Sequence, residues 1–144
     1  MKRFLLTLIL MTFAGFASAQ SFTFEHNGET VEPGTYDVIG NIDPVSYDMV
    51  FSFNVRNITN NNIVIKCDRV ILEQSHSDAM YPSENNVCTG ESCYPSFMNN
   101  IDIELSGNAE VEFAAHFIPA FDDTYTYPLE GSSMKVQYSF YTNT

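Results

Sequence analysis

Apolar and polar residues alternate along most of the chain after residue 20, a pattern typical of strands that bury one face. The clearest stretch is 49–56, where Met49, Phe51, Phe53 and Val55 share one side. The same period occurs at 22–25, 63–68, 101–105, 110–117 and 134–140. Residues 35–39, which follow the turn pair Pro33–Gly34, are a further candidate strand. The pattern therefore predicts an all-β protein.

One stretch changes its phase. Ile63, Ile65 and Cys67 point inward if the alternation is regular, but the next apolar pair is Val70 and Leu72. A shift of one residue exchanges the two faces of a strand. We therefore predict a bulge or bend near residues 68–69.

The number and spacing of these stretches predict how the strands are arranged. About six to eight short strands separated by turns are typical of two antiparallel sheets whose inner faces form one core. The chain of 144 residues contains no repeat, low-complexity tract or internal linker. We expect a single sandwich domain over residues 20–144.

The first nineteen residues have the organisation of a secretory signal peptide. Lys2 and Arg3 precede an apolar run at 4–16, and Ala17, Ser18 and Ala19 are the small residues of a cleavage site. A membrane-spanning helix is the alternative, but it needs roughly 20 apolar residues, more than this run supplies. We predict a cleaved signal peptide at 1–19 and an exported protein, periplasmic or extracellular, without a membrane span.

Charge limits the classes of partner. The chain has 6 Lys and Arg residues against 18 Asp and Glu residues, and a formal net charge of −12. Nucleic acids and anionic membrane surfaces both attract basic proteins, so neither is an expected partner.

Three cysteines give the most specific local signal. Cys88 and Cys93 enclose a four-residue turn, and an oxidising compartment favours a disulfide between them. A zinc site usually needs a second pair of ligands, which the spacing does not offer. Cys67 faces inward by its phase and is expected to be a small buried apolar residue. Pairing of Cys67 with Cys88 or Cys93, or with another molecule, remains open.

Parts of residues 51–140 resemble a known group of domains. The matching segments are 57–60 with 64–67, then Cys88 to Pro95, then 113–119, and finally Gly131 with 136–140. They are similar to small immunoglobulin-like domains of exported Bacteroidetes proteins, which often precede a type IX secretion sorting domain. The resemblance implies an immunoglobulin-like antiparallel two-sheet sandwich without catalytic residues or cofactors.

The residues themselves offer little for catalysis. His116 is expected on the solvated face of its strand, and His26 lies in an acidic turn. His76 is the best candidate because Ser75 and Asp78 are close to it in sequence, but a catalytic triad converges from separate segments. Glu110 and Glu112 are expected to be solvated surface carboxylates. No nucleophile elbow, zinc helix or phosphate loop occurs, so we expect no enzyme activity.

Binding functions remain. The most favoured is contact with a protein or glycan outside the cytoplasm, and four tyrosines, Tyr94, Tyr125, Tyr127 and Tyr141, are candidates for stacking on sugars. Calcium or small-ligand binding is an alternative, for which Asp122 and Asp123 are weak candidate ligands, with further loop aspartates at Asp43, Asp48 and Asp78. A structural subunit that exchanges strands is the third possibility. The sequon Asn57-Ile58-Thr59 matters only in a host that glycosylates such sites.

Overall fold

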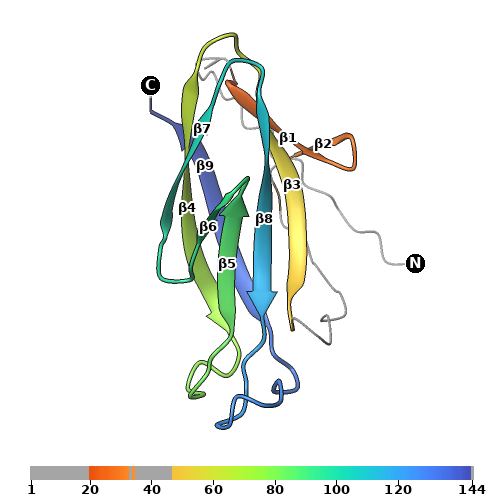
Figure 1. Ribbon diagram of the computed structural model, residues 1–144, viewed down its shortest axis with the longest axis vertical. Coiled ribbons are helices and arrows are strands. Elements are labelled where there is room, and N and C mark those ends of the chain that lie inside the picture. The colour runs from red at the N-terminus through yellow and green to blue at the C-terminus, as the bar shows by residue number, and fades with distance from the viewer. Residues whose placement is uncertain (1–19, 33, 35–46, 144) are drawn as a thin grey trace, which may run out of the picture.

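The computed structural model describes residues 20–32, 34 and 47–143, which form two antiparallel β-sheets packed face to face (Figure 1). The larger sheet has the strand order β2-β1-β3-β8-β5-β6, and the smaller sheet has the order β7-β4-β9. The bounds are β1 Phe22–His26, β2 Glu29–Val31, β3 Met49–Asn57, β4 Ile63–Gln74, β5 Glu84–Thr89, β6 Ser92–Tyr94, β7 Asn100–Leu105, β8 Glu110–Ile118 and β9 Met134–Thr142.

The facing sides of the two sheets supply one core. The larger sheet contributes Val55, Val87 and Phe113, and the smaller sheet contributes Ile65, Cys67, Ile101, Ile103 and Leu105. These positions recur at every second residue of their strands, as the alternation predicts. The all-β prediction and the prediction of two antiparallel sheets are therefore confirmed.

The predicted bulge near residues 68–69 is wrong. The inward phase of β4 continues through Arg69, whose exposed fraction is only 2%, and the register with β9 shifts between Ile71 and Glu73. Because Arg69 is charged, the sequence pattern suggests that its side chain faces solvent, and the alternation therefore looks shifted by one residue although the strand is regular there. Val70 and Leu72 are consequently exposed apolar residues on the outer surface.

The connections gather at two ends of the sandwich. The turns β3–β4 and β7–β8 lie at one end of the molecule, and the loops 75–83 and 119–133 lie at the other (Figure 1). The predicted signal peptide at 1–19 and the predicted strand at 35–39 lie outside the described residues. In the part of the chain that the structure describes, no helix is long and apolar enough to cross a bilayer.

Candidate functional site

The loops 75–83 and 119–133 hold each other in place. The backbone N–H of Phe121 donates to the carbonyl of Tyr81 at 2.9 Å, and the N–H of Leu129 donates to the carbonyl of Ala120 at 2.7 Å. Ala120 and Phe121 are buried, so the longer loop has a small apolar anchor of its own. These contacts give the two loops a defined shape although they lie outside the sheets.

Asp122 organises the tip of the longer loop. Its Oδ1 atom accepts hydrogen bonds from the hydroxyl and N–H of Thr124 and from the N–H groups of Thr126 and Tyr127. These donors favour the ionised carboxylate, with the Thr126 N–H the largest contribution, and they lower the pKa of Asp122 below its ordinary value. The aspartate thus acts as the internal brace of this loop.

The braced loops expose a group of apolar and aromatic side chains. Tyr125 and Tyr127 are 60% and 68% exposed, and Met80 is 66% exposed. The Tyr125 ring packs against Tyr81 and Phe121, with centroid distances of 4.9 Å and 4.6 Å. We call the exposed residues Met80, Tyr81, Tyr125 and Tyr127, together with the buried Phe121 that packs against Tyr125, the tyrosine-rich end.

A hollow of about 350 Å³ lies beside the tyrosine-rich end. It is lined by His76, Asp78, Ala79, Phe121, Asp122, Asp123 and Leu129. The structure thus brings the predicted catalytic candidate His76 close to the predicted calcium candidates Asp122 and Asp123. Among the described residues, however, no group of three or more His, Cys, Asp or Glu side chains has the arrangement that a metal ion needs.

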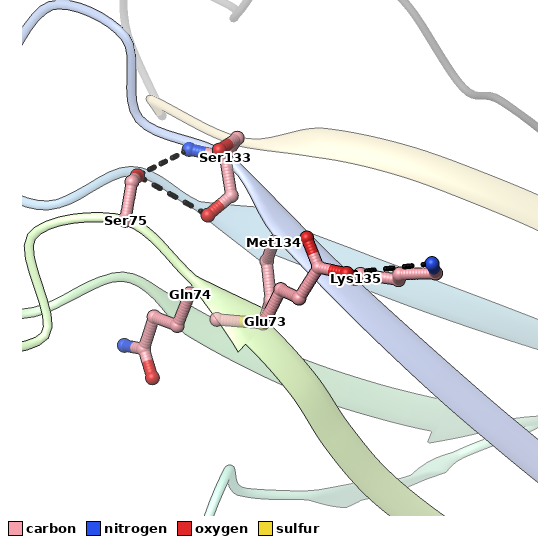
Figure 2. A pocket seen from close by; sticks show the side chains of 6 residues that line it. All are labelled: Glu73, Gln74, Ser75, Ser133, Met134 and Lys135. Carbon is pink, nitrogen blue, oxygen red and sulfur yellow. Dashed lines mark hydrogen bonds and ion pairs between the residues drawn. The ribbon is translucent and has the colours of Figure 1, made fainter.

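A second hollow, of about 330 Å³, lies where β4 ends and β9 begins. Figure 2 shows its lining, with Ser75 and Ser133 joined by hydrogen bonds and Lys135 next to Glu73. The N–H of Ser133 donates to Ser75 Oγ at 2.7 Å, and the Ser75 hydroxyl donates to the Ser133 carbonyl at 3.2 Å. The serine hydroxyl therefore serves to join two chain segments.

The predicted cluster of Ser75, His76 and Asp78 does not form a catalytic arrangement. His76 Nε2 lies 2.9 Å from the carbonyl oxygen of Glu130, and Ser75 is engaged with Ser133. His26 lies elsewhere, with its Nδ1 2.6 Å from the carbonyl oxygen of Ser52. Each imidazole thus contacts a backbone carbonyl rather than a nucleophile.

His116 differs from the expectation of a simple solvated histidine. Its Nδ1 lies 2.6 Å from Oδ2 of Asp48, and both side chains are about one quarter exposed. Asp48, predicted as a loop aspartate for calcium, is therefore paired with this histidine. The two residues are 68 positions apart, so no local pattern in the sequence indicates their contact.

The predicted disulfide between Cys88 and Cys93 is present. The two residues are direct partners across the β5–β6 hairpin, and the turn itself is shorter than predicted because Thr89 and Ser92 also pair. Cys67 is a free thiol with no exposed surface, so its pairing with Cys88 or Cys93 is wrong. Burial, and to a smaller extent Asp68, raises the pKa of Cys67 to about 12, which makes the thiolate scarce at neutral pH.

The four predicted tyrosines separate in space. Tyr125 and Tyr127 share the tyrosine-rich end, whereas Tyr94 lies on β6 and Tyr141 on β9. The Tyr141 hydroxyl contacts Asp68 at 3.1 Å. Glu110 and Glu112 are exposed on β8 as predicted, and Asp43 lies outside the described residues. Only the first two tyrosines therefore remain candidates for one shared surface.

Two buried polar residues were missed as structural anchors. The Arg69 guanidinium donates to the carbonyls of Asn85, Pro95 and Met98. Asn57, read only as a glycosylation sequon, is fully buried and donates to the carbonyls of Asn61, Leu105 and Ser106. A glycan on Asn57 is incompatible with this fold. The inward phase of Arg69 along β4 was the available signal for its role.

Comparison of the chain with protein-family models, with curated proteins and with solved structures found no match in any of the three.

Proposed function

We propose that this protein is an exported, non-catalytic immunoglobulin-like module that binds a protein or glycan outside the cytoplasm through the tyrosine-rich end. The observation that carries this proposal is the concentration of exposed aromatic and apolar side chains on two braced loops at one end of the sandwich.

Export is supported by the signal-peptide pattern at 1–19 and by the Cys88–Cys93 disulfide, which persists in oxidising compartments. The immunoglobulin-like assignment rests on the resemblance of the sequence segments and is compatible with two face-to-face antiparallel sheets. In such sandwiches, loops at one end are suited to recognition because rigid sheets position them.

Tyrosine is well suited to a binding surface. Its ring supplies a large contact area at little cost in conformational entropy, and its hydroxyl can form a hydrogen bond at the rim. The contacts of Tyr125 with Tyr81 and Phe121 fix its ring before a partner arrives. This preorganisation lowers the entropic cost of binding.

Calcium binding is less well supported by this geometry. Oδ1 of Asp122 is already occupied by four donors from its own loop, and Asp48 is paired with His116. The non-catalytic assignment is a proposal that follows from the contacts of the three histidines with carbonyl oxygens and a carboxylate.

The test is a comparison of tyrosine variants in a binding screen. Wild-type protein, the double variant Tyr125→Ala/Tyr127→Ala and the control Tyr141→Ala are immobilised and exposed to a glycan array and to an envelope fraction of the source cells. Truncation of a tyrosine at the centre of an interface typically costs about 2 kcal/mol, which corresponds to roughly 30-fold weaker binding.

We expect the double variant to lose the bound glycan or protein, and Tyr141→Ala to retain it, because Tyr141 lies on β9, outside the tyrosine-rich end. Equal retention by all three proteins would refute the role of the tyrosine-rich end. Unchanged melting temperatures for the double variant are needed as evidence that the fold is intact.

A further inference from the structure

The two sheets differ in width, and the smaller sheet leaves part of the larger sheet incompletely covered. Phe113 on β8 has no exposed surface, but its direct register partner Phe53 on β3 is only partly buried. Phe51, on the same strand as Phe53, and Phe24, on the neighbouring strand β1, are also partly buried. From the smaller sheet, the aromatic ring of Phe140 on β9 packs against this region, and its centroid lies 4.9 Å from that of Phe24.

Strand β9 forms the edge of the smaller sheet next to this region. It is nine residues long and, among the described residues, pairs only with β4. The other described edge strands are less suited to pairing with an additional strand. Strands β2 and β6 have only three residues each, and β7 carries the carboxylates of Asp102 and Glu104. β9 contains one lysine, no carboxylate and no proline, so it lacks the usual features that prevent edge pairing, apart from Lys135.

The hydrogen-bond pattern of β4 with its two neighbours, β7 and β9, shows which backbone groups of β9 face away from β4. The N–H of Arg69 donates to Asn99, on the β7 side of β4, so alternate residues of β4 direct their groups toward β9. Those residues are Lys66, Asp68 and Val70, and their partners are Tyr141, Ser139 and Gln137. The N–H and C=O groups of Val136, Tyr138 and Phe140 therefore point to the side of β9 on which no described strand lies, called the free side below.

We propose that the free edge of β9 accepts an extended segment of a partner polypeptide as a fourth strand of the smaller sheet. Residues of this segment that pair with Val136, Tyr138 and Phe140 point inward, and apolar side chains there cover Phe51 and Phe53. The intervening residues face solvent beside Gln137 and Ser139. Because the protein has a net charge of −12, an uncharged or basic segment fits better than an acidic one.

The experiment uses a synthetic peptide of the length of β9, with valine at alternate positions and threonine or lysine between them. Amide exchange of the protein is followed by NMR with and without an excess of this peptide. We expect exchange at Val136, Tyr138 and Phe140 to slow by about tenfold or more, with little change at Gln137 and Ser139, which already bond to β4. A peptide of the same composition with its valines grouped together is the control.

Two variants make the test specific to this edge. Val136→Pro removes one outward N–H and places a ring on the free side, so the peptide is no longer bound. Val136→Thr keeps the N–H and retains binding. Tyr125→Ala, in the tyrosine-rich end and outside β9, leaves peptide binding unchanged and separates this proposal from the proposed function.

Three results would overturn the proposal. The first is that the outward amides of β9 do not respond to the alternating peptide. The second is that they are already protected in the dilute protein alone, which would show that the chain itself occupies the edge. The third is that protection rises with protein concentration without peptide, which would make a second copy the occupant instead of a partner segment.

Discussion

The two ends of the sandwich are both ordered by one polar side chain, but the two side chains differ in their burial. At one end, buried Asn57 donates to three carbonyls and accepts from the N–H and hydroxyl of Thr59. At the other end, half-buried Asp122 accepts from Thr124, Thr126 and Tyr127. A fully buried anchor that joins distant segments is tied to the stability of the whole fold, whereas a half-buried anchor bonded within one loop shapes that loop and leaves the nearby side chains free for contact.

The largest effect is expected for Asn57→Ala. The change removes the Asn57 donor from the buried carbonyl of Leu105 and from the partly buried carbonyl of Ser106, at a cost of about 3 kcal/mol in the free energy of unfolding. Urea denaturation measures this loss. The control is Asn100→Ala, which removes an exposed hydrogen bond to Asp68 and should change stability by less than about 0.5 kcal/mol. Similar losses for the two variants would contradict the assignment of Asn57 as a buried anchor.

The second prediction concerns the core between the two ends, whose stability should fall at alkaline pH. Burial raises the pKa of Cys67 and of Tyr138 to about 12, so both groups hold their protons more tightly in the folded state. Their contribution to the free energy of unfolding is complete below the pKa values of the unfolded chain, which are about 8.5 for Cys and about 10 for Tyr. This contribution is lost as the pH rises toward the folded values of about 12.

Between its unfolded and folded pKa values, each group lowers the free energy of unfolding by at most about 1.4 kcal/mol per pH unit. Denaturation midpoints measured between neutral pH and pH 11 should fall faster for wild type than for Cys67→Ala, and the slopes rather than the starting stabilities are compared. Identical slopes would mean that Cys67 does not titrate on unfolding.

Asp122→Ala should act locally. Because the carboxylate accepts hydrogen bonds only from its own loop, the global unfolding midpoint should stay close to that of wild type. Amide exchange at Thr126 and Tyr127 should nevertheless accelerate, since both N–H groups lose their acceptor. Asp123→Ala is the matched neighbour, and a comparable acceleration in that variant would argue against a specific role of Asp122.

The smallest effect is expected on acidification. The pKa of Asp122 is lowered, so its bracing is present above the ordinary carboxyl pKa and is lost as the pH falls through the lower folded value. The amide shifts of Thr126 and Tyr127 should titrate with a midpoint below 3.8, while those of Leu105 and Ser106, near Asn57, should not follow this transition. A midpoint at or above the ordinary value would show that the hydrogen bonds to Asp122 do not persist in solution.

The sequence predicted β1, β3, β4, β7, β8 and β9, because burial of one face imposes a period of two on the residues, but it gave no strand range for β2, β5 or β6. Positions such as Val55, Ile65, Ile103 and Phe113 were identified as inward from this period alone. The alternation did not indicate the inward position of Arg69, where three backbone carbonyls compensate the burial of a guanidinium. The alternation of residue types depends only on their polarity. It cannot show that a polar side chain forms hydrogen bonds inside the folded protein.

The candidate site was predicted only in pieces. Tyr125, Tyr127, His76 and Asp122 were each noted, but no sequence pattern placed them at one end of the fold. The role of Asp122 as a brace had a weak local signal in the threonines that follow it, since short polar side chains favour turns that bond to nearby N–H groups.

Period-two patterning, together with the short spacing of Cys88 and Cys93, determined the all-β class, most inward positions and the disulfide, because these depend on neighbours along the chain. Only the tertiary structure decided the sheet order, the burial of Asn57 and Arg69, the contact of His116 with Asp48 and the position of β9 at an edge. Each of these depends on which segments meet across dozens of residues, and that choice is made by the packing of the two sheets as a whole.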